Sequence, residues 1–67
     1  MKNKRLKIAM KEAEVTYTET AAKMGRNAKV FANKINQRTV NGNIVRFNVT
    51  EKEWLANEFG LKASEIE

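Results

Sequence analysis

The sequence predicts a mainly α-helical domain with four to five helices and one short β-hairpin between the third and the fourth helix. Apolar residues recur at helical spacing in several segments, and two Thr–x–x–Glu patterns indicate where helices start. One segment, just after Asn41–Gly42, alternates apolar and polar residues as strands do. The 67 residues contain no repeat, low-complexity stretch or linker, so we expect a single compact domain over 1–67.

The first helix is expected over residues 3–14, with Asn3 as its N-cap. Its apolar residues recur at helical spacing between Lys and Glu side chains: Leu6, Ala9, Met10 and Ala13. A second helix, 17–24, follows a capping box formed by Thr16 and Glu19.

The next segment indicates a helix–turn–helix. Gly25 is suited to the left-handed conformation that ends a helix, and the small Ala21 four residues earlier allows the next helix to cross closely. The third helix is expected from about residue 27 to 37. Val30, Phe31 and Ile35 are predicted to lie on one face, where Phe31 and Ile35 anchor the helix in the core.

A change of period follows the third helix. Asn41–Gly42 is typical of a two-residue hairpin turn, and we expect Thr39–Val40 to pair with Asn43–Val45. Thr50 and Glu53 then form a second capping box for a helix that reaches Phe59 and ends at Gly60. Val49 and Trp54 have the spacing of a hydrophobic staple, and Leu61 and Ile66 predict a last helical turn over 63–67.

Composition excludes several chemistries. The chain has no Cys and no His, so a thiolate nucleophile, an imidazole base, a disulfide framework and a structural zinc site are excluded. We find no catalytic constellation and expect a non-enzymatic protein with no cofactor, metal or small-molecule ligand. No apolar run is long enough to span a membrane, and no secretory leader is recognisable, which indicates a cytoplasmic protein.

Positive charge is concentrated in one half of the chain. Residues 1–38 carry ten bases and three acids, a net of +7, whereas 39–67 carry three bases and five acids, a net of −2. This asymmetry favours one surface that faces a polyanion. The basic side chains expected to contact a nucleic-acid backbone are Lys23, Arg26, Lys34 and Arg38.

The third helix carries small polar residues on the side expected to face outward. Asn can bond adenine, Lys can reach guanine or phosphate, and Ala can touch a thymine methyl group. The residues predicted to contact bases are Asn27, Ala28, Lys29, Ala32, Asn33 and Asn36. The start of the second helix is expected to lie at a phosphate, with hydroxyls from Thr16, Tyr17 and Thr18.

These motifs resemble a known family. Leu6-x-x-Ala9, the run from Val15 to Gly25, and Phe31-x-x-x-Ile35-Asn36 are similar to the lambda-repressor/Cro-type helix-turn-helix domains of bacteriophage transcription regulators, and to small Cro repressors among them. The segment from Thr50 to Ile66 is similar to their fourth and fifth helices. The resemblance implies a recognition helix over 27–36 and a repressor that binds a palindromic DNA operator as a homodimer.

Some features depart from the family or remain open. Arg26 replaces an apolar residue, Glu14 stands where many members have Gly, and the stretch from Arg38 to Asn48 is longer than usual. That stretch could be a wing on DNA, or its edge could pair with a second copy. An excisionase-like architectural protein is one alternative function, and a protein-interaction module such as an antirepressor is another.

Overall fold

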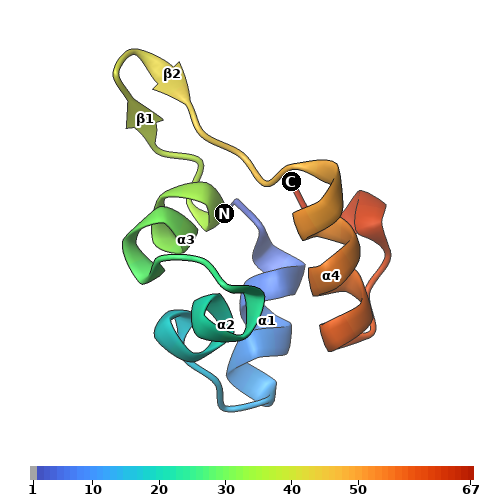
Figure 1. The fold of residues 1–67 in the computed structure, drawn as a ribbon. Helices are drawn as coiled ribbons and strands as arrows, with labels where there is room; N and C mark the ends of the chain where they lie inside the picture. Colours follow the sequence, from blue (N-terminus) through green and yellow to red (C-terminus); the bar gives the residue numbers. More distant parts are fainter. Residues whose placement is uncertain (1) are drawn as a thin grey trace.

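A computed structural model describes residues 2–67, and its helices pack around one core (Figure 1). Over these residues it contains α1 (Lys4–Glu12), α2 (Tyr17–Met24), α3 (Ala28–Ile35), β1 (Thr39–Val40), β2 (Asn43–Ile44), α4 (Val49–Phe59) and the 3₁₀ turn η1 (Ala63–Glu65). The predicted mainly helical architecture, with a hairpin between the third and fourth helices, is confirmed. The expected fifth helix is only the three-residue turn η1. No helix within residues 2–67 is long and apolar enough to cross a membrane.

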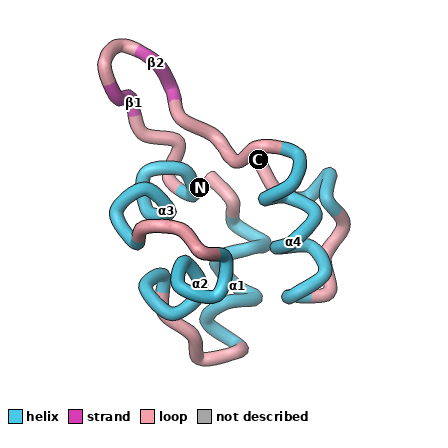
Figure 2. Tube along the Cα trace, viewed as in Figure 1, coloured by secondary structure: helices cyan, strands magenta, loops and turns pink. Residues whose placement is uncertain are grey.

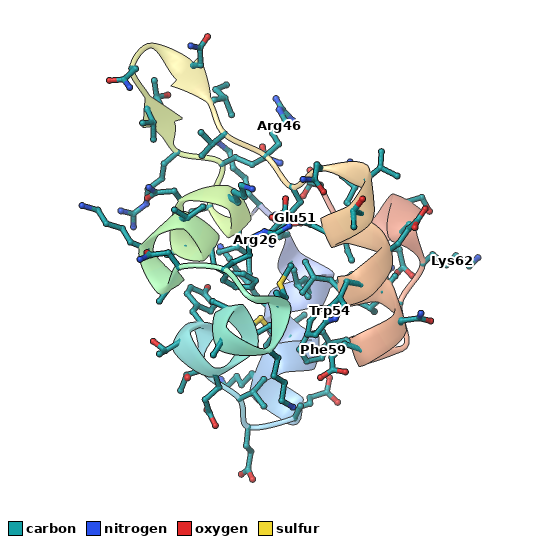
Figure 3. The ribbon with its side chains drawn as sticks, viewed as in Figure 1. Arg26, Arg46, Glu51, Trp54, Phe59 and Lys62 are labelled. Atoms are coloured by element: carbon teal, nitrogen blue, oxygen red, sulfur yellow. The ribbon has the colours of Figure 1, made fainter. Side chains whose placement is uncertain are left out.

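The core draws one or two side chains from each helix. Phe31 of α3 lies at its centre, with ring centroids 5.6 Å from Tyr17 and 5.4 Å from Phe47. The other buried hydrophobic residues of the core are Leu6, Met10, Ala21, Ile35, Leu55, Ala56 and Ile66. Trp54 and Phe59 pack against this cluster, as predicted, and point inward from α4 (Figure 3).

The predicted start and end of α2 are confirmed. The Glu19 amide donates to the Thr16 hydroxyl at 3.1 Å, and the Thr16 amide donates to the Glu19 carboxylate at 2.9 Å. Gly25 adopts φ 71°, and the Arg26 amide donates to the Ala21 carbonyl at 2.8 Å. This arrangement satisfies the last carbonyls of α2 and turns the chain directly into α3.

The predicted start of α4 is wrong. The N-cap is Asn48 instead of Thr50: its side chain accepts from the Glu51 amide at 2.8 Å, and Glu51 accepts from the Asn48 amide at 2.9 Å. Val49 is therefore the first helical residue and 71% exposed, so it forms no hydrophobic staple with Trp54. Asn caps a helix as well as Thr does, and this register turns the Glu51 carboxylate toward the cations of α3.

Asn3 occupies the predicted N-cap position of α1, but it does not cap the helix with its side chain. It has φ 55° and its side chain makes no capping bond. It is fully buried instead, and its amide donates to the Ile35 carbonyl at 2.9 Å. At its other end α1 stops at Glu12, so Ala13 lies outside the helix and is exposed.

Glu14 follows α1 in the left-handed conformation, with φ 57°. The Val15 amide donates to the Met10 carbonyl and the Glu14 amide to the Lys11 carbonyl, the pattern usually completed by glycine. Because Glu14 is exposed, Glu14→Gly is expected to raise the free energy of unfolding by about 1 kcal/mol, measured by urea denaturation. Gly25→Ala places a Cβ at φ 71° and is expected to lower the free energy of unfolding by a similar amount. No gain from Glu14→Gly would contradict backbone strain at this position.

The hairpin extends away from the helices (Figures 1 and 2). Thr39 pairs with Ile44 and Val40 with Asn43, around Asn41 at φ 52° and Gly42 at φ 81°. The turn is therefore the predicted one, with positive φ at both central residues. β2 ends one residue before the predicted Val45, although the Val45 amide still donates to the Arg38 carbonyl at 3.0 Å.

Candidate nucleic-acid interface

The inner and outer sides of α3 differ sharply. Phe31 and Ile35 are buried in the core, whereas Lys29 and Val30 are exposed. Asn33 is half-buried and its side chain makes no hydrogen bond within residues 2–67. Lys29, Val30 and Asn33 lie on neighbouring helical positions opposite the core, and we refer to them as the α3 ridge.

Val30 belongs to this ridge, so the prediction that it shares one face with Phe31 and Ile35 is wrong. It is 43% exposed, because Phe31 and Ile35, four residues apart, define the buried stripe. Val30 precedes Phe31 by one residue, so it is rotated by about 100° around the helix axis. Its spacing of five residues from Ile35 was the sequence signal that could have identified it as outward-facing.

The six predicted base-contacting residues are not all on the surface. Ala28 packs against the core, which contradicts its predicted outward position, and Ala32 is half-buried. Asn27 is exposed, but its side chain accepts from the Lys29 amide at 2.8 Å and so caps α3. Asn36 is half-buried, since it donates to the Ala32 carbonyl and accepts from the Lys7 ammonium at 2.8 Å. Lys29 and Asn33 are therefore the predicted residues best placed to meet a ligand.

The first residues of α2 lie beside the hydrophobic core. The Thr16 hydroxyl is used in the capping box, and the Tyr17 ring packs against Phe31. Thr18 is exposed in the first turn. Of these three predicted phosphate contacts, Thr18 is the one that is exposed and whose side chain makes no hydrogen bond within residues 2–67.

The four cations predicted to contact a nucleic-acid backbone have different surroundings. Lys23 lies 3.4 Å from Glu58 of α4 in an exposed ion pair. Arg26 and Lys34 both bind Glu51, at 3.0 and 2.9 Å. Arg38 is exposed and has no ion-pair partner within residues 2–67.

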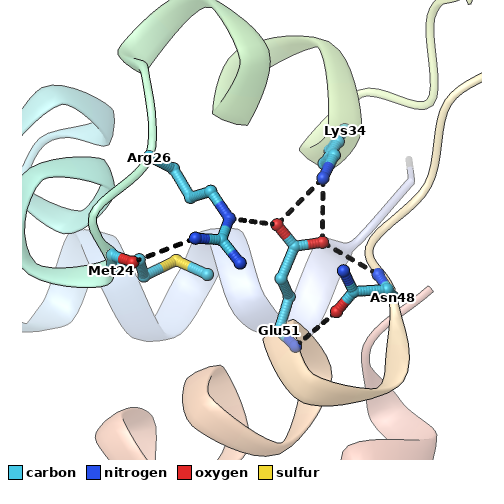
Figure 4. Close-up of polar contacts among 5 residues, drawn as sticks. All are labelled: Met24, Arg26, Lys34, Asn48 and Glu51. Atoms are coloured by element: carbon cyan, nitrogen blue, oxygen red, sulfur yellow. Dashed lines mark hydrogen bonds and ion pairs between the residues drawn. The ribbon is translucent and has the colours of Figure 1, made fainter.

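Glu51 is the most buried acid in the described part of the chain, at 2% exposure. Its carboxylate accepts from Arg26, from Lys34 and from the Asn48 amide (Figure 4). Burial alone would raise the pKa of Glu51. The Asn48 amide and the two cations outweigh this and hold the pKa below its ordinary value. Glu51 therefore stays ionised and joins α4 to both ends of α3.

Negative charge is absent around the α3 ridge in the sequence. Residues 20–50, which include most of α2, all of α3 and the hairpin, contain no acid. They contain six bases: Lys23, Arg26, Lys29, Lys34, Arg38 and Arg46. Arg46 projects from the segment between the hairpin and α4, whereas Lys62 extends outward beside α4 (Figure 3).

The candidate site is a convex helical surface. Residues 2–67 enclose no pocket and hold no cluster of three His, Cys, Asp or Glu side chains. Comparison of the chain with protein-family models, curated proteins and solved structures gives no match.

Proposed function

We propose that this protein is a sequence-specific double-stranded DNA-binding regulator that places α3 in the major groove, as a Cro-like repressor does. The observation that carries the proposal is the α3 ridge. Lys29, Val30 and Asn33 lie on the side of α3 opposite the core, and the Asn33 side chain makes no hydrogen bond within residues 2–67. They lie within a stretch of 31 residues, 20–50, that has bases but no acids. A polyanion is the partner that such a surface fits.

Each ridge residue suits one kind of base contact. Asn33 can form paired hydrogen bonds with adenine, Lys29 can reach guanine acceptors or a phosphate, and Val30 can contact a thymine methyl group. Thr18, at the start of α2, can donate its hydroxyl to a phosphate. Arg38 follows α3 and is available for a second phosphate.

The protein is proposed to act in the cytoplasm as a homodimer on a palindromic operator, with the two α3 helices about 34 Å apart along the DNA. Repression then follows from occupation of a promoter and requires no cofactor. The projecting hairpin favours one second candidate, an excisionase-like architectural protein that binds DNA with a helix and a wing. A symmetric footprint supports the repressor, whereas a direct array with DNA bending supports the excisionase.

Titration with duplex DNA at several salt concentrations tests the proposal. Selection from a random-sequence duplex pool supplies the operator, and an unrelated duplex measures non-specific binding. If the protein neutralises about 4–8 phosphates, log K should fall with log salt at a slope of about −4 to −7. No binding to any duplex at low salt would refute the proposal and favour a protein-interaction module.

Asn33→Ala is expected to weaken binding to the selected operator by about 1–3 kcal/mol, because a paired contact to adenine is lost. Binding to the unrelated duplex should change little. Asn57→Ala is the matched control, since Asn57 is exposed on α4. Equal losses on the two duplexes would show that Asn33 does not distinguish bases.

A further inference from the structure

We propose that Glu51 is a specificity-determining residue: it holds the recognition helix in place and keeps two cations, Arg26 and Lys34, from binding DNA phosphates. The inference rests on the proposed DNA-binding function and extends it to a residue that lies outside α3. Glu51 thereby raises the ratio of operator affinity to non-specific affinity.

The geometry of the cluster places one carboxylate between three partners. Lys34 donates to both carboxylate oxygens at 2.9 Å, and Arg26 donates through Nε at 3.0 Å (Figure 4). The Asn48 amide donates to Oε1 at 2.9 Å. Hydrogen bonds in which both donor and acceptor are charged are stronger than those between neutral groups. Glu51, which accepts these bonds, is almost completely buried.

Arg26 and Lys34 stand at the two ends of α3. Arg26 lies in the turn before its N-cap, and Lys34 lies in its last turn. Both ends of α3 are thus joined to α4 through the Glu51 side chain. These two ion pairs restrict the rotation of α3 about its axis and its translation along that axis. Such support matters because base contacts tolerate only small displacements of the residues that make them.

The same bonds limit the charge available to DNA. The side chain of Lys34 is only 20% exposed and that of Arg26 is 40% exposed. Non-specific binding comes from the number of phosphates that cations neutralise, and each contact contributes about −0.9 to the salt slope. Cations that Glu51 holds contribute less to this sequence-independent binding, so the unpaired ridge residues of α3 decide more of the affinity.

Glu51→Gln tests the inference, and Glu53→Gln is its matched control. Glutamine at the third helical position can still form the capping box with Asn48, so the variant mainly removes the charge. Glu53 is exposed on the same helix and has no ion-pair partner within residues 2–67, yet its substitution changes net charge equally. Circular dichroism establishes that each variant is folded before DNA is added.

With Glu51→Gln, binding to the unrelated duplex is expected to tighten about 10-fold and its salt slope to steepen by about 1–2. The operator-to-unrelated affinity ratio should fall by a similar factor. Glu53→Gln should show at most a small part of these changes. Adding Lys34→Gln to Glu51→Gln should recover about one unit of the slope, which a general loosening of the fold would not do.

The outcomes separate the two proposals. Wild-type protein that binds no duplex refutes the DNA-binding function itself. Wild-type protein that prefers its operator, with Glu51→Gln and Glu53→Gln alike in slope and ratio, leaves DNA binding intact and overturns the role of Glu51. If Glu51→Gln does not fold, Lys34→Gln in the wild-type background decides: an unchanged non-specific slope supports the inference, and a slope shallower by about one overturns it.

Discussion

Phe31→Ala is expected to lower the free energy of unfolding by about 3–5 kcal/mol, which is most of the stability available to a domain of this size. Phe31 is buried and joins three parts of the chain, because its ring packs against Tyr17 of α2 and against Phe47 in the segment that returns from the hairpin. Truncation removes both aromatic contacts and leaves a cavity beneath α3. The sequence contains no Cys, so no disulfide offsets the loss, and stability depends on the apolar core.

Urea denaturation followed by circular dichroism measures this effect. Val30→Ala is the matched control, because Val30 is the preceding residue on the same helix and is exposed. It should alter stability by about 0.5 kcal/mol or less. Losses of equal size in the two variants would contradict the assignment of Phe31 to the core and Val30 to the surface.

Asn3→Ala is expected to destabilise the protein by about 2–4 kcal/mol, because two polar groups lose a buried partner. The Asn3 side chain donates to the Ile35 carbonyl at 2.9 Å and accepts from the Glu67 amide at 2.7 Å. The two termini lie close together near the end of α3 (Figure 1). Asn3 therefore connects the beginning of the chain, the end of α3 and the C-terminal residue.

Asn3→Ser distinguishes this role from helix capping. Serine is as good an N-cap as asparagine, so a capping residue would tolerate the change. Serine is too short to bridge the Ile35 carbonyl and the Glu67 amide together, so we expect a loss close to that of Asn3→Ala. Thermal denaturation of the three proteins measures it, with Asn57→Ala as an exposed control. Wild-type stability in Asn3→Ser would show that Asn3 acts as a cap.

Both ends of α2, the end of α4 and the hairpin were predictable because their signals act over a few residues. The Thr16–Glu19 capping box, the left-handed Gly25 and Gly60, and the Asn41–Gly42 turn all lie as expected. In each case a side chain bonds the backbone three residues away, or a residue without a Cβ relieves local strain. Such signals can be read from neighbouring residues without knowledge of the tertiary structure.

Errors arose where two local solutions were nearly equal. Asn48 and Thr50 are both good N-caps, and each is followed by a glutamate three residues later. The helix begins after Asn48, whose partner Glu51 forms ion pairs with Arg26 and Lys34. Val30 and Phe31 are both apolar neighbours on α3, and the residue that packs against Tyr17 and Phe47 is Phe31. The candidate site was predicted in part: the helix and its buried residues Phe31 and Ile35 were predicted correctly, whereas Val30 and Ala28 were assigned to the wrong side of it.

The amino-acid pattern was thus sufficient for the helical class, for the two helices that meet at Gly25 and for the basic half of the chain, since spacing and composition are local properties. Only the folded chain decides which of those bases stay available. Arg26 and Lys34 meet Glu51 across 25 and 17 residues of sequence, and Asn3 meets Glu67 across 64. No period or motif encodes such pairs, because they depend on how the helices pack around Phe31. That packing leaves Lys29, Val30 and Asn33 as the outward ridge of α3.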